Sequence, residues 1–189
     1  MRIGLFGGTF DPPHLVHLVI AEAAYRQLGL DEVWLVPAGI PWQKQGTDLS
    51  PAHHRWAMTK AATDPVSYLK CDDREVVRPG PTYTFDTVSG PADHDLTLIL
   101  GADAASRISS WYRSDDLLKM VEVAVAPRPG VCRSQVDEVP DLRARWLDVP
   151  HLELSGTYLR KRAAAGKSLR FLVPEEVRKY IQQHRLYLG

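Results

Sequence analysis

The alternation of short apolar runs with helix-like segments limits the fold of this chain more than any other sequence feature. Runs typical of buried strands occupy residues 2–6, 32–36, 67–71, 95–100 and 122–126. Helical patterns alternate with them, at residues 14–28, 51–63, 82–89, 103–109, 113–120, 157–165 and 174–184. This order predicts an α/β fold, a Rossmann-like doubly wound parallel sheet with helices on both faces. We expect a small C-terminal helical portion at about 155–189.

The length and charge of the chain narrow its class. A chain of 189 residues suits one domain, here residues 1–189, and buries roughly 70% of its unfolded surface without disulfides or metals. Lys and Arg (23) balance Asp and Glu (23), which argues against a nucleic-acid partner. We expect Cys71 and Cys132 to be reduced thiols, since their spacing fits no metal site. Without a signal-like or membrane-spanning run, we expect a cytoplasmic protein with no membrane partner. The sequence does not decide whether the protein is a monomer or a homo-oligomer.

Parallel sheets of this kind bind ligands at the carboxyl ends of their strands. We therefore expect the chemistry in the loops that follow residues 6, 36, 100 and 126. Segments 37–50 and 127–141 are rich in Pro and Gly, and the sequence predicts that they are long, mobile loops.

The segment after the first predicted strand favours phosphate binding. Gly7 and Gly8 form a turn that lets a phosphate approach the backbone closely, and the following helix start offers free N–H groups. His14 and His17 share a helix face, and imidazole donates to phosphoryl oxygens with a charge that adjusts near neutral pH. A zinc site lacks a third ligand, and Gly4, Gly7 and Gly8 do not form the dinucleotide-binding fingerprint.

This segment resembles the signature of the nucleotidyltransferase superfamily, a glycine-rich turn followed by His-x-Gly-His. The stretch 7–12 is similar to bacterial nicotinate-nucleotide adenylyltransferases. The resemblance implies that ATP phosphates bind to the residues Gly7, Gly8, Thr9, Phe10, His14 and His17. Val16 replaces the motif glycine, a position near the adenine in the superfamily. A branched side chain there would crowd the base by about 1–3 kcal/mol, which affects nucleobase choice and ATP affinity.

A second anion site is predicted near the C-terminus. Ser155 is a favourable N-cap, and Arg160 lies one turn into the helix, where its guanidinium can bind two phosphate oxygens. The segment resembles the superfamily's Ser-Ser-Thr-x-x-Arg motif, with Gly156 in place of the second serine. By this resemblance, Ser155, Thr157 and Arg160 bind the leaving pyrophosphate.

The acceptor side rests on three further segments. The loop that ends in Lys44 resembles the family's Pro-Pro-His-Lys loop, so Lys44 is expected to contact phosphate and to act in catalysis with His14, His17 and Arg160. Residues 82–84 open a predicted helix, and free N–H groups there suit a carboxylate. The resemblance implies that the nicotinate nucleotide contacts Lys44, Thr82, Tyr83, Thr84, Trp111 and Tyr112.

The strand at 95–100 leads into Gly101 and Asp103, which are placed for ATP and for ribose hydroxyls. Trp111 offers a flat face on which a pyridine ring can stack, although filling the core is the alternative. The remaining histidines have no comparable context and are expected to pack or to lie on the surface: His53, His54, His94, His151 and His184.

The resemblance implies conversion of nicotinate mononucleotide and ATP to nicotinate adenine dinucleotide and pyrophosphate. The mononucleotide phosphate is already anionic and attacks the ATP α-phosphorus in line, so no general base is required. We expect Mg²⁺ to be carried with ATP, since no carboxylate cluster is apparent. Three alternatives stay open: adenylylation of nicotinamide mononucleotide, adenylylation of phosphopantetheine, and a non-catalytic nucleotide sensor.

Overall fold

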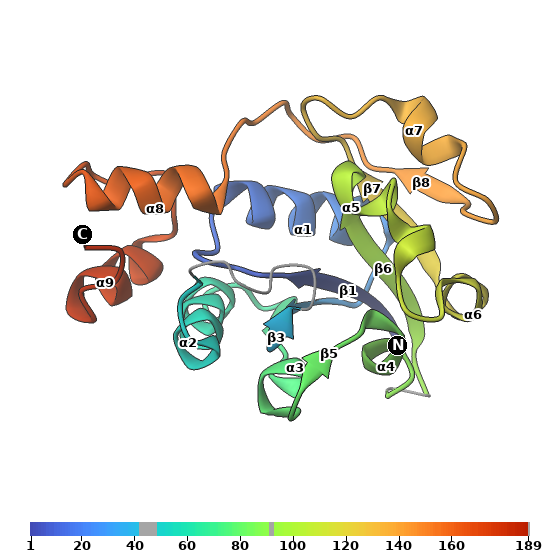
Figure 1. Cartoon of the computed structure of the whole chain (residues 1–189), viewed down its shortest axis with the longest axis horizontal. Coiled ribbons are helices and arrows are strands. Elements are labelled where there is room, and N and C mark those ends of the chain that lie inside the picture. The colour runs from blue at the N-terminus through green and yellow to red at the C-terminus, as the bar shows by residue number, and fades with distance from the viewer. Residues whose placement is uncertain (42–48, 91–92, 189) are drawn as a thin grey trace.

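Six parallel strands form the main sheet of the computed structural model, which describes residues 1–41, 49–90 and 93–188 (Figure 1). Their order across the sheet is β4 (Leu69–Cys71), β2 (Glu32–Pro37), β1 (Arg2–Gly8), β6 (Asp95–Gly101), β7 (Glu122–Ala126) and β8 (Ala144–Trp146). Every neighbouring pair is parallel. The chain steps outward from β1 in one direction and from β6 in the other, so the expected doubly wound α/β fold is confirmed.

Helices connect these strands. In chain order they are α1 (Leu15–Leu28), α2 (Ala52–Thr63), α3 (Arg74–Val77), α4 (Thr84–Val88), α5 (Ala102–Ala105), α6 (Ser114–Met120), α7 (Arg133–Asp137), α8 (Gly156–Ala164) and α9 (Glu175–Gln183). A 3-10 turn, η2 (Ile108–Ser110), separates α5 from α6. The short strands β3 (Ile40–Pro41) and β5 (Pro81–Thr82) pair in a second parallel sheet. No helix in these described ranges is long and apolar enough to cross a membrane.

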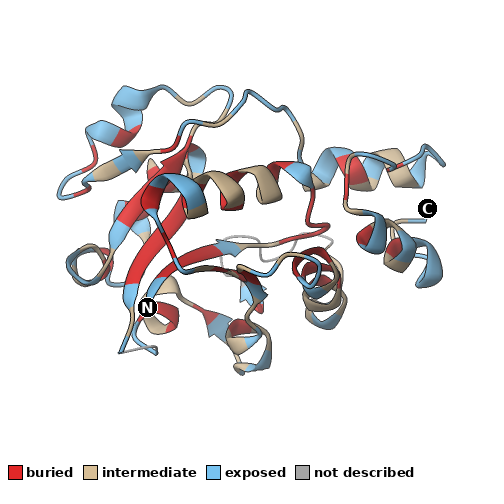
Figure 2. Ribbon diagram, turned by 180° about the vertical axis from the view of Figure 1, so that it is seen from behind, coloured by how far each residue is buried: buried red, intermediate tan, exposed pale blue. Residues whose placement is uncertain are grey.

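Both faces of the main sheet are covered, because side chains alternate along each strand. Ile3 and Leu5 of β1 point into one core cluster, which also contains Leu117 of α6, whereas Phe6 points into a second cluster with Ile20 of α1. Helix α1 lies on one side of the sheet, and α2, α3 and α4 lie on the other (Figure 1). The buried residues follow the strands and the inward sides of these helices (Figure 2).

The C-terminal helices pack on α2 rather than on the sheet. Leu159 of α8 and Val177 of α9 share a third cluster with Met58 of α2, and all three side chains are buried. The expected C-terminal helices are therefore present at 156–164 and 175–183. Through α2, they are brought to the end of the molecule where β1 finishes (Figure 1).

Some predicted boundaries are wrong. Strand β1 continues through Gly7 and Gly8, so the glycine pair ends a strand instead of forming the turn after it. The helix predicted at 82–89 starts only at Thr84, because residues 81–82 pair with β3. The helix predicted at 103–109 is divided into α5 and η2.

Residues 127–141 are not the uninterrupted loop that composition predicts, since they contain α7, and β8 follows them. The sequence does not predict strand β8, because its three residues, Ala-Arg-Trp, lie at the edge of the sheet and form no buried apolar run. Within the predicted loop 37–50, residues 42–48 lie outside the described part.

Candidate functional site

A pocket of about 1000 Å³ opens where the carboxyl ends of β1 and β6 meet, the point at which the sheet changes direction. Of the predicted site residues, only Lys44 lies outside the described residues. The others all line this pocket: Gly7, Gly8, Thr9, Phe10, His14, His17, Thr82, Tyr83, Thr84, Gly101, Asp103, Trp111, Tyr112, Ser155, Thr157 and Arg160. The fold thus brings both predicted phosphate motifs and the described part of the predicted acceptor segments into one cavity.

The glycine pair at the end of β1 serves two different purposes. A Cβ atom on Gly7 would have no atom within 4 Å, so the backbone there is open to the pocket. A Cβ atom on Gly8 would lie 2.9 Å from the ring of Phe10, so the absence of a side chain there admits that ring. The Phe10 ring is 1% exposed and meets the His17 ring edge-on at 4.9 Å between centroids. Glycine at position 8 therefore lets Phe10 support His17.

The two histidines lie together at the start of α1, as their spacing predicts. His14 is the N-cap, its backbone N–H donates to His17 Nδ1 (3.1 Å), and the ring centroids lie 3.8 Å apart. With Nδ1 as the acceptor, neutral His17 carries its proton on Nε2.

The predicted charge behaviour is wrong for His14. Its side chain is 2% exposed, and burial, followed by the positive charge of Arg128, lowers the pKa of His14 to about 3. His14 is therefore a neutral imidazole at physiological pH. It can donate a hydrogen bond to a phosphate but adds no positive charge.

The second phosphate motif docks directly on the segment after β1. Ser155 caps α8 by accepting from the Tyr158 N–H (3.2 Å), and Arg160 Nη1 donates to the carbonyl oxygen of Asp11 (2.8 Å). A Cβ atom on Gly156 would lie 2.7 Å from that carbonyl oxygen. This close approach accounts for glycine at the position where the superfamily motif has serine.

Arg55 of α2 is a functional support that sequence reasoning missed. Its guanidinium is buried and donates to the carbonyl oxygens of Thr9, Ala38, Gly39 and Ser50. It thereby ties together the loops that follow β1 and β2. One sequence signal was available, since Arg55 stands three, four and seven residues before the buried Met58, Thr59 and Ala62, on the inward face of its helix.

The buried carboxylate of Asp11 was missed in the same way. It accepts hydrogen bonds from the Tyr187 hydroxyl (2.6 Å) and the Ser50 N–H (3.0 Å), and Arg160 Nη1 lies 3.8 Å away. The C-terminal segment therefore reaches the phosphate motifs. Burial, followed by the negative charge of Asp11, raises the pKa of Tyr187, so its hydroxyl remains a donor.

Aromatic residues line the other end of the pocket. The rings of Tyr83 and Tyr112 lie 4.8 Å apart, and Tyr112 is half exposed. Trp111 both packs against the first core cluster and lines the pocket. The two interpretations of Trp111, core packing and ligand contact, are therefore compatible.

Arg128 completes the site. It follows β7, where a functional loop was expected, but no residue of that loop was singled out from the sequence. Its Nε lies 3.7 Å from Asp103 Oδ1, beside Gly101. Among the described residues of the pocket wall, three buried side-chain nitrogens have no hydrogen-bond partner: His14 Nδ1, Trp111 Nε1 and Arg128 Nε. Unpartnered buried polar atoms around a cavity are typical of a site completed by a ligand.

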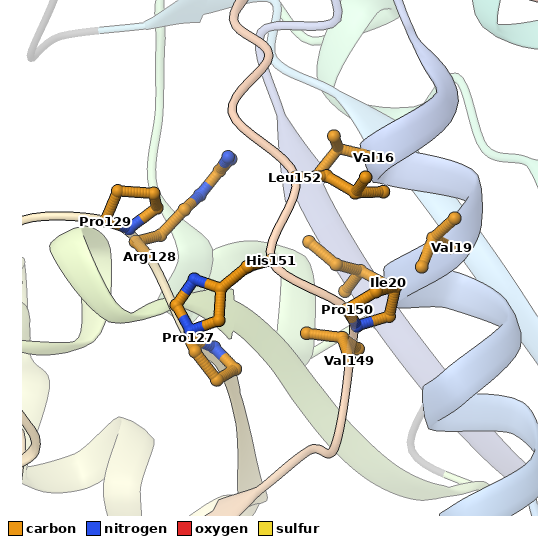
Figure 3. Close-up of a pocket in the computed structure, with 10 residues that line it drawn as sticks. All are labelled: Val16, Val19, Ile20, Pro127, Arg128, Pro129, Val149, Pro150, His151 and Leu152. Carbon is orange, nitrogen blue, oxygen red and sulfur yellow. The ribbon is translucent and has the colours of Figure 1, made fainter.

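Val16, which replaces the motif glycine, lies in the wall of a smaller cavity of about 10 Å³ (Figure 3). Its side chain faces Leu152, with Arg128 across the cavity (Figure 3). Arg128, Pro129 and Leu152 line both cavities, so the small one adjoins the main pocket. The effect of Val16 on nucleobase choice stays a prediction.

The described residues contain no group of three or more His, Cys, Asp or Glu side chains arranged to hold a metal ion. Cys71 and Cys132 are both free thiols. Burial, followed by the charge of Asp72, raises the pKa of Cys71 to about 12, so this thiol stays protonated.

Known proteins resemble this chain over most of its length. Residues 5–162 match the model of the cytidylyltransferase-like family. The chain is 41% identical over 191 residues to a probable nicotinate-nucleotide adenylyltransferase of Salinibacter ruber, covering 99% of this chain and 98% of that protein. It is 40% identical to the nicotinate-nucleotide adenylyltransferase of Bacillus subtilis, with 98% of both chains covered.

Solved structures support the fold at lower sequence identity. The nicotinic acid mononucleotide adenylyltransferase of Plasmodium falciparum, complexed with NaAD, superposes with a TM-score of 0.82 at 20% identity. The match covers 98% of this chain and 97% of that one. From the whole-length identity with its bacterial relatives, this chain belongs to the nicotinate-nucleotide adenylyltransferase family.

Proposed function

We propose that this protein transfers the adenylyl group of ATP to nicotinate mononucleotide, releasing pyrophosphate, as a step of NAD biosynthesis. The observation that carries the proposal is the single pocket at the switch point of the sheet. It gathers two phosphate motifs and a set of aromatic residues, and its wall holds three unpartnered buried nitrogens. Its relatives of about 40% identity bear the name of this activity.

In the proposed reaction a phosphate oxygen of the mononucleotide attacks the α-phosphorus of ATP. A bond forms between that oxygen and the α-phosphorus, and the bond from the α-phosphorus to the oxygen that bridges it to the β-phosphorus breaks. Pyrophosphate leaves with the electron pair of the broken bond. Since the nucleophile is already anionic, catalysis consists of alignment and stabilisation of charge, and no residue needs to remove a proton.

The residues divide these tasks according to their surroundings. Gly7 exposes backbone to the phosphates, His17 donates from Nε2, and His14 donates as a neutral imidazole. Arg160 and the start of α8, capped by Ser155, face the leaving pyrophosphate. Lys44 is proposed to contribute a further positive charge. Arg128 joins this group because its Nε lies in the pocket wall without a hydrogen bond, although Asp103 lies 3.7 Å away.

The acceptor is assigned to the aromatic end of the pocket. Trp111 is proposed to stack on the pyridine, and Tyr112 and the main chain of residues 82–84 are proposed to recognise the carboxylate. Asp103, whose side chain is half exposed beside Arg128, is proposed to bind ribose hydroxyls.

A divalent metal is proposed to accompany ATP as part of the substrate, and Mg²⁺ is the expected ion. The described residues do not fit a metal held by the protein alone, since the one buried acid of the phosphate motifs, Asp11, already accepts from Tyr187 and Ser50. ATP oxygens and water would supply most of its ligands.

Pyrophosphate release tests the acceptor assignment. The protein is mixed with Mg²⁺-ATP and, in parallel, with nicotinate mononucleotide, nicotinamide mononucleotide or phosphopantetheine. We expect release with the nicotinate compound to be well above release with the other two. ATP binding without release for any acceptor would instead indicate a nucleotide sensor, and release mainly with phosphopantetheine would contradict the assignment of the aromatic end.

A further inference from the structure

A buried carboxyl group lies in the pocket wall outside every motif described so far. Glu75 of α3 is 8% exposed and lines the pocket beside Thr82 and Thr87. No residue of the described ranges forms a salt bridge with it. The positive charge of Arg78 only partly offsets the burial of this acid, which disfavours folding, whereas an apolar residue would fill the same volume without that cost. A role in the pocket is therefore a better explanation than a role in folding.

The surroundings of the Glu75 carboxyl group come from two separate elements of the acceptor end. The Thr87 hydroxyl, on α4, donates to Glu75 Oε1 (2.6 Å), and the Thr82 hydroxyl, on β5, lies close enough to the carboxyl group to stabilise its ionised form. Both threonines are buried. Burial raises the pKa of Glu75, and the two hydroxyls oppose that rise. The carboxyl group thus links the strand and the helix on either side of Tyr83.

The backbone of Glu75 is fixed as firmly as its side chain. Its carbonyl oxygen lies so close to Gly39 that a Cβ atom there would be 2.0 Å away. The carbonyl of Gly39 in turn accepts from Arg55 Nη2 (2.7 Å). Helix α3 is therefore held against the end of β2, and Glu75 extends from this fixed point toward Thr82 and Thr87.

We propose that Glu75 is a positioning residue for the acceptor, which holds the segment 82–87 in the pocket wall through the hydroxyls of Thr82 and Thr87. This inference rests on the proposed function, because the segment it holds is the one assigned to nicotinate mononucleotide. Glu75 acts on the mononucleotide through that segment, and its carboxyl group forms no hydrogen bond with the described residues of the phosphate motifs.

The chemistry of the link favours a carboxyl group over an amide. Two hydroxyl donors are best matched by a group with two acceptor oxygens. Glutamine supplies one oxygen and one NH₂ group, so it keeps one hydrogen bond and forces the other hydroxyl to become an acceptor. Alanine loses both. Glutamate, glutamine and alanine at position 75 therefore weaken the contact with the threonine hydroxyls step by step, and none of them changes a residue of the phosphate motifs.

The test compares steady-state constants of Glu75→Gln, Glu75→Ala and Thr87→Val, with Glu138→Gln on an exposed site as the matched control. We expect Glu75→Ala to raise the KM for nicotinate mononucleotide about tenfold, since each unsatisfied buried hydroxyl carries a penalty. Glu75→Gln should fall between Ala and wild type. Because the lost interaction is present in both ground and transition states, kcat and the KM for ATP should change less than about twofold.

A double mutant distinguishes a specific interaction between Glu75 and Thr87 from a general loss of structure around the pocket. If Glu75 acts through Thr87, the increase in KM for Glu75→Ala with Thr87→Val should be well below the product of the single increases. Three results would each overturn the proposal. The increase in KM of the double mutant could equal the product of the single increases, the KM for the mononucleotide could stay unchanged, or the KM values for ATP and for the mononucleotide could rise equally. Should Glu75→Ala fail to fold, the KM values of Glu75→Gln and Thr87→Val still test the proposal.

Turnover of the wild-type protein is measured first. If the wild type is inactive with every acceptor, the result counts against the proposed function. If the wild type is active and the variants keep its KM values, the result counts against the role of Glu75 alone.

Discussion

The neighbouring histidines at the start of α1 differ in how they can act. His14 is buried and His17 is half-buried, although three positions separate them. Folding lowers the pKa of His14 from 6.5 to about 3, so the unfolded chain binds the proton more readily between these values. The stability associated with neutral His14 is complete above pH 6.5 and decreases as the pH falls toward 3.

This difference predicts a pH effect on stability. His14→Asn keeps an N-cap side chain but cannot titrate, so its unfolding free energy should decrease less than that of wild type between pH 7 and pH 5. Urea denaturation at several pH values measures the two slopes. His151→Asn, at an exposed histidine, serves as the control and should keep the wild-type slope. Equal slopes for His14→Asn and wild type would contradict a neutral, buried His14.

His17 carries the prediction for catalysis. Removing one preorganised donor to a transferring group typically lowers the rate about 10²–10³-fold, and we expect His17→Ala to lose at least that much in kcat. His53→Ala, at an exposed histidine of α2, should keep near-normal turnover. Steady-state pyrophosphate release gives both values. Near-normal turnover of His17→Ala would remove His17 from the mechanism.

At the scale of elements, α2 stabilises the loops around the pocket through the buried side chain of Arg55. Arg55 donates to four carbonyl oxygens outside the main sheet: that of Thr9 after β1, those of Ala38 and Gly39 after β2, and that of Ser50 before α2. We predict that Arg55→Ala lowers the unfolding free energy by about 3 kcal/mol or more, because buried carbonyl groups lose their donors. Arg26→Ala removes an exposed ion pair with Glu22 and a contact with the Tyr25 ring, and it should cost no more than about 1 kcal/mol. Similar losses for the two variants, measured by urea denaturation, would show that Arg55 does not fasten these loops.

The success of prediction from sequence also depends on the element. Strands β1, β2, β6 and β7 were predicted because each is buried on both faces and reads as a continuous apolar run. The pair β3 and β5 was not predicted, since two-residue strands depend on a partner far along the chain. The site motifs were found from local patterns of glycine, histidine and hydroxyl residues. Arg55, Glu75 and Tyr187 were missed because their partners are distant in sequence and become neighbours only in the fold.

At the scale of the whole molecule, the C-terminal segment meets the segment after β1 at the proposed phosphate site. Tyr187 donates to Asp11, and Asp11 in turn accepts from Arg160 through its carbonyl oxygen. We predict that Tyr187→Phe lowers the unfolding free energy by about 1–3 kcal/mol, because a buried carboxylate loses a donor. It should also raise the KM for ATP more than the KM for the mononucleotide. Tyr25→Phe, whose ring stacks on Tyr68 far from the pocket, is the control. An unchanged KM for ATP would mean that the C-terminal segment stabilises the fold without supporting the site.

In the proposed reaction, one pocket joins two nucleotides through the α-phosphorus of ATP. The most direct measurement follows ATP labelled at its α-phosphorus in the presence of nicotinate mononucleotide, with the products separated by chromatography. We expect the label to appear in a dinucleotide, in an amount equal to the pyrophosphate released. Label that stays in ATP, or that appears as AMP at the same rate without the mononucleotide, would contradict it.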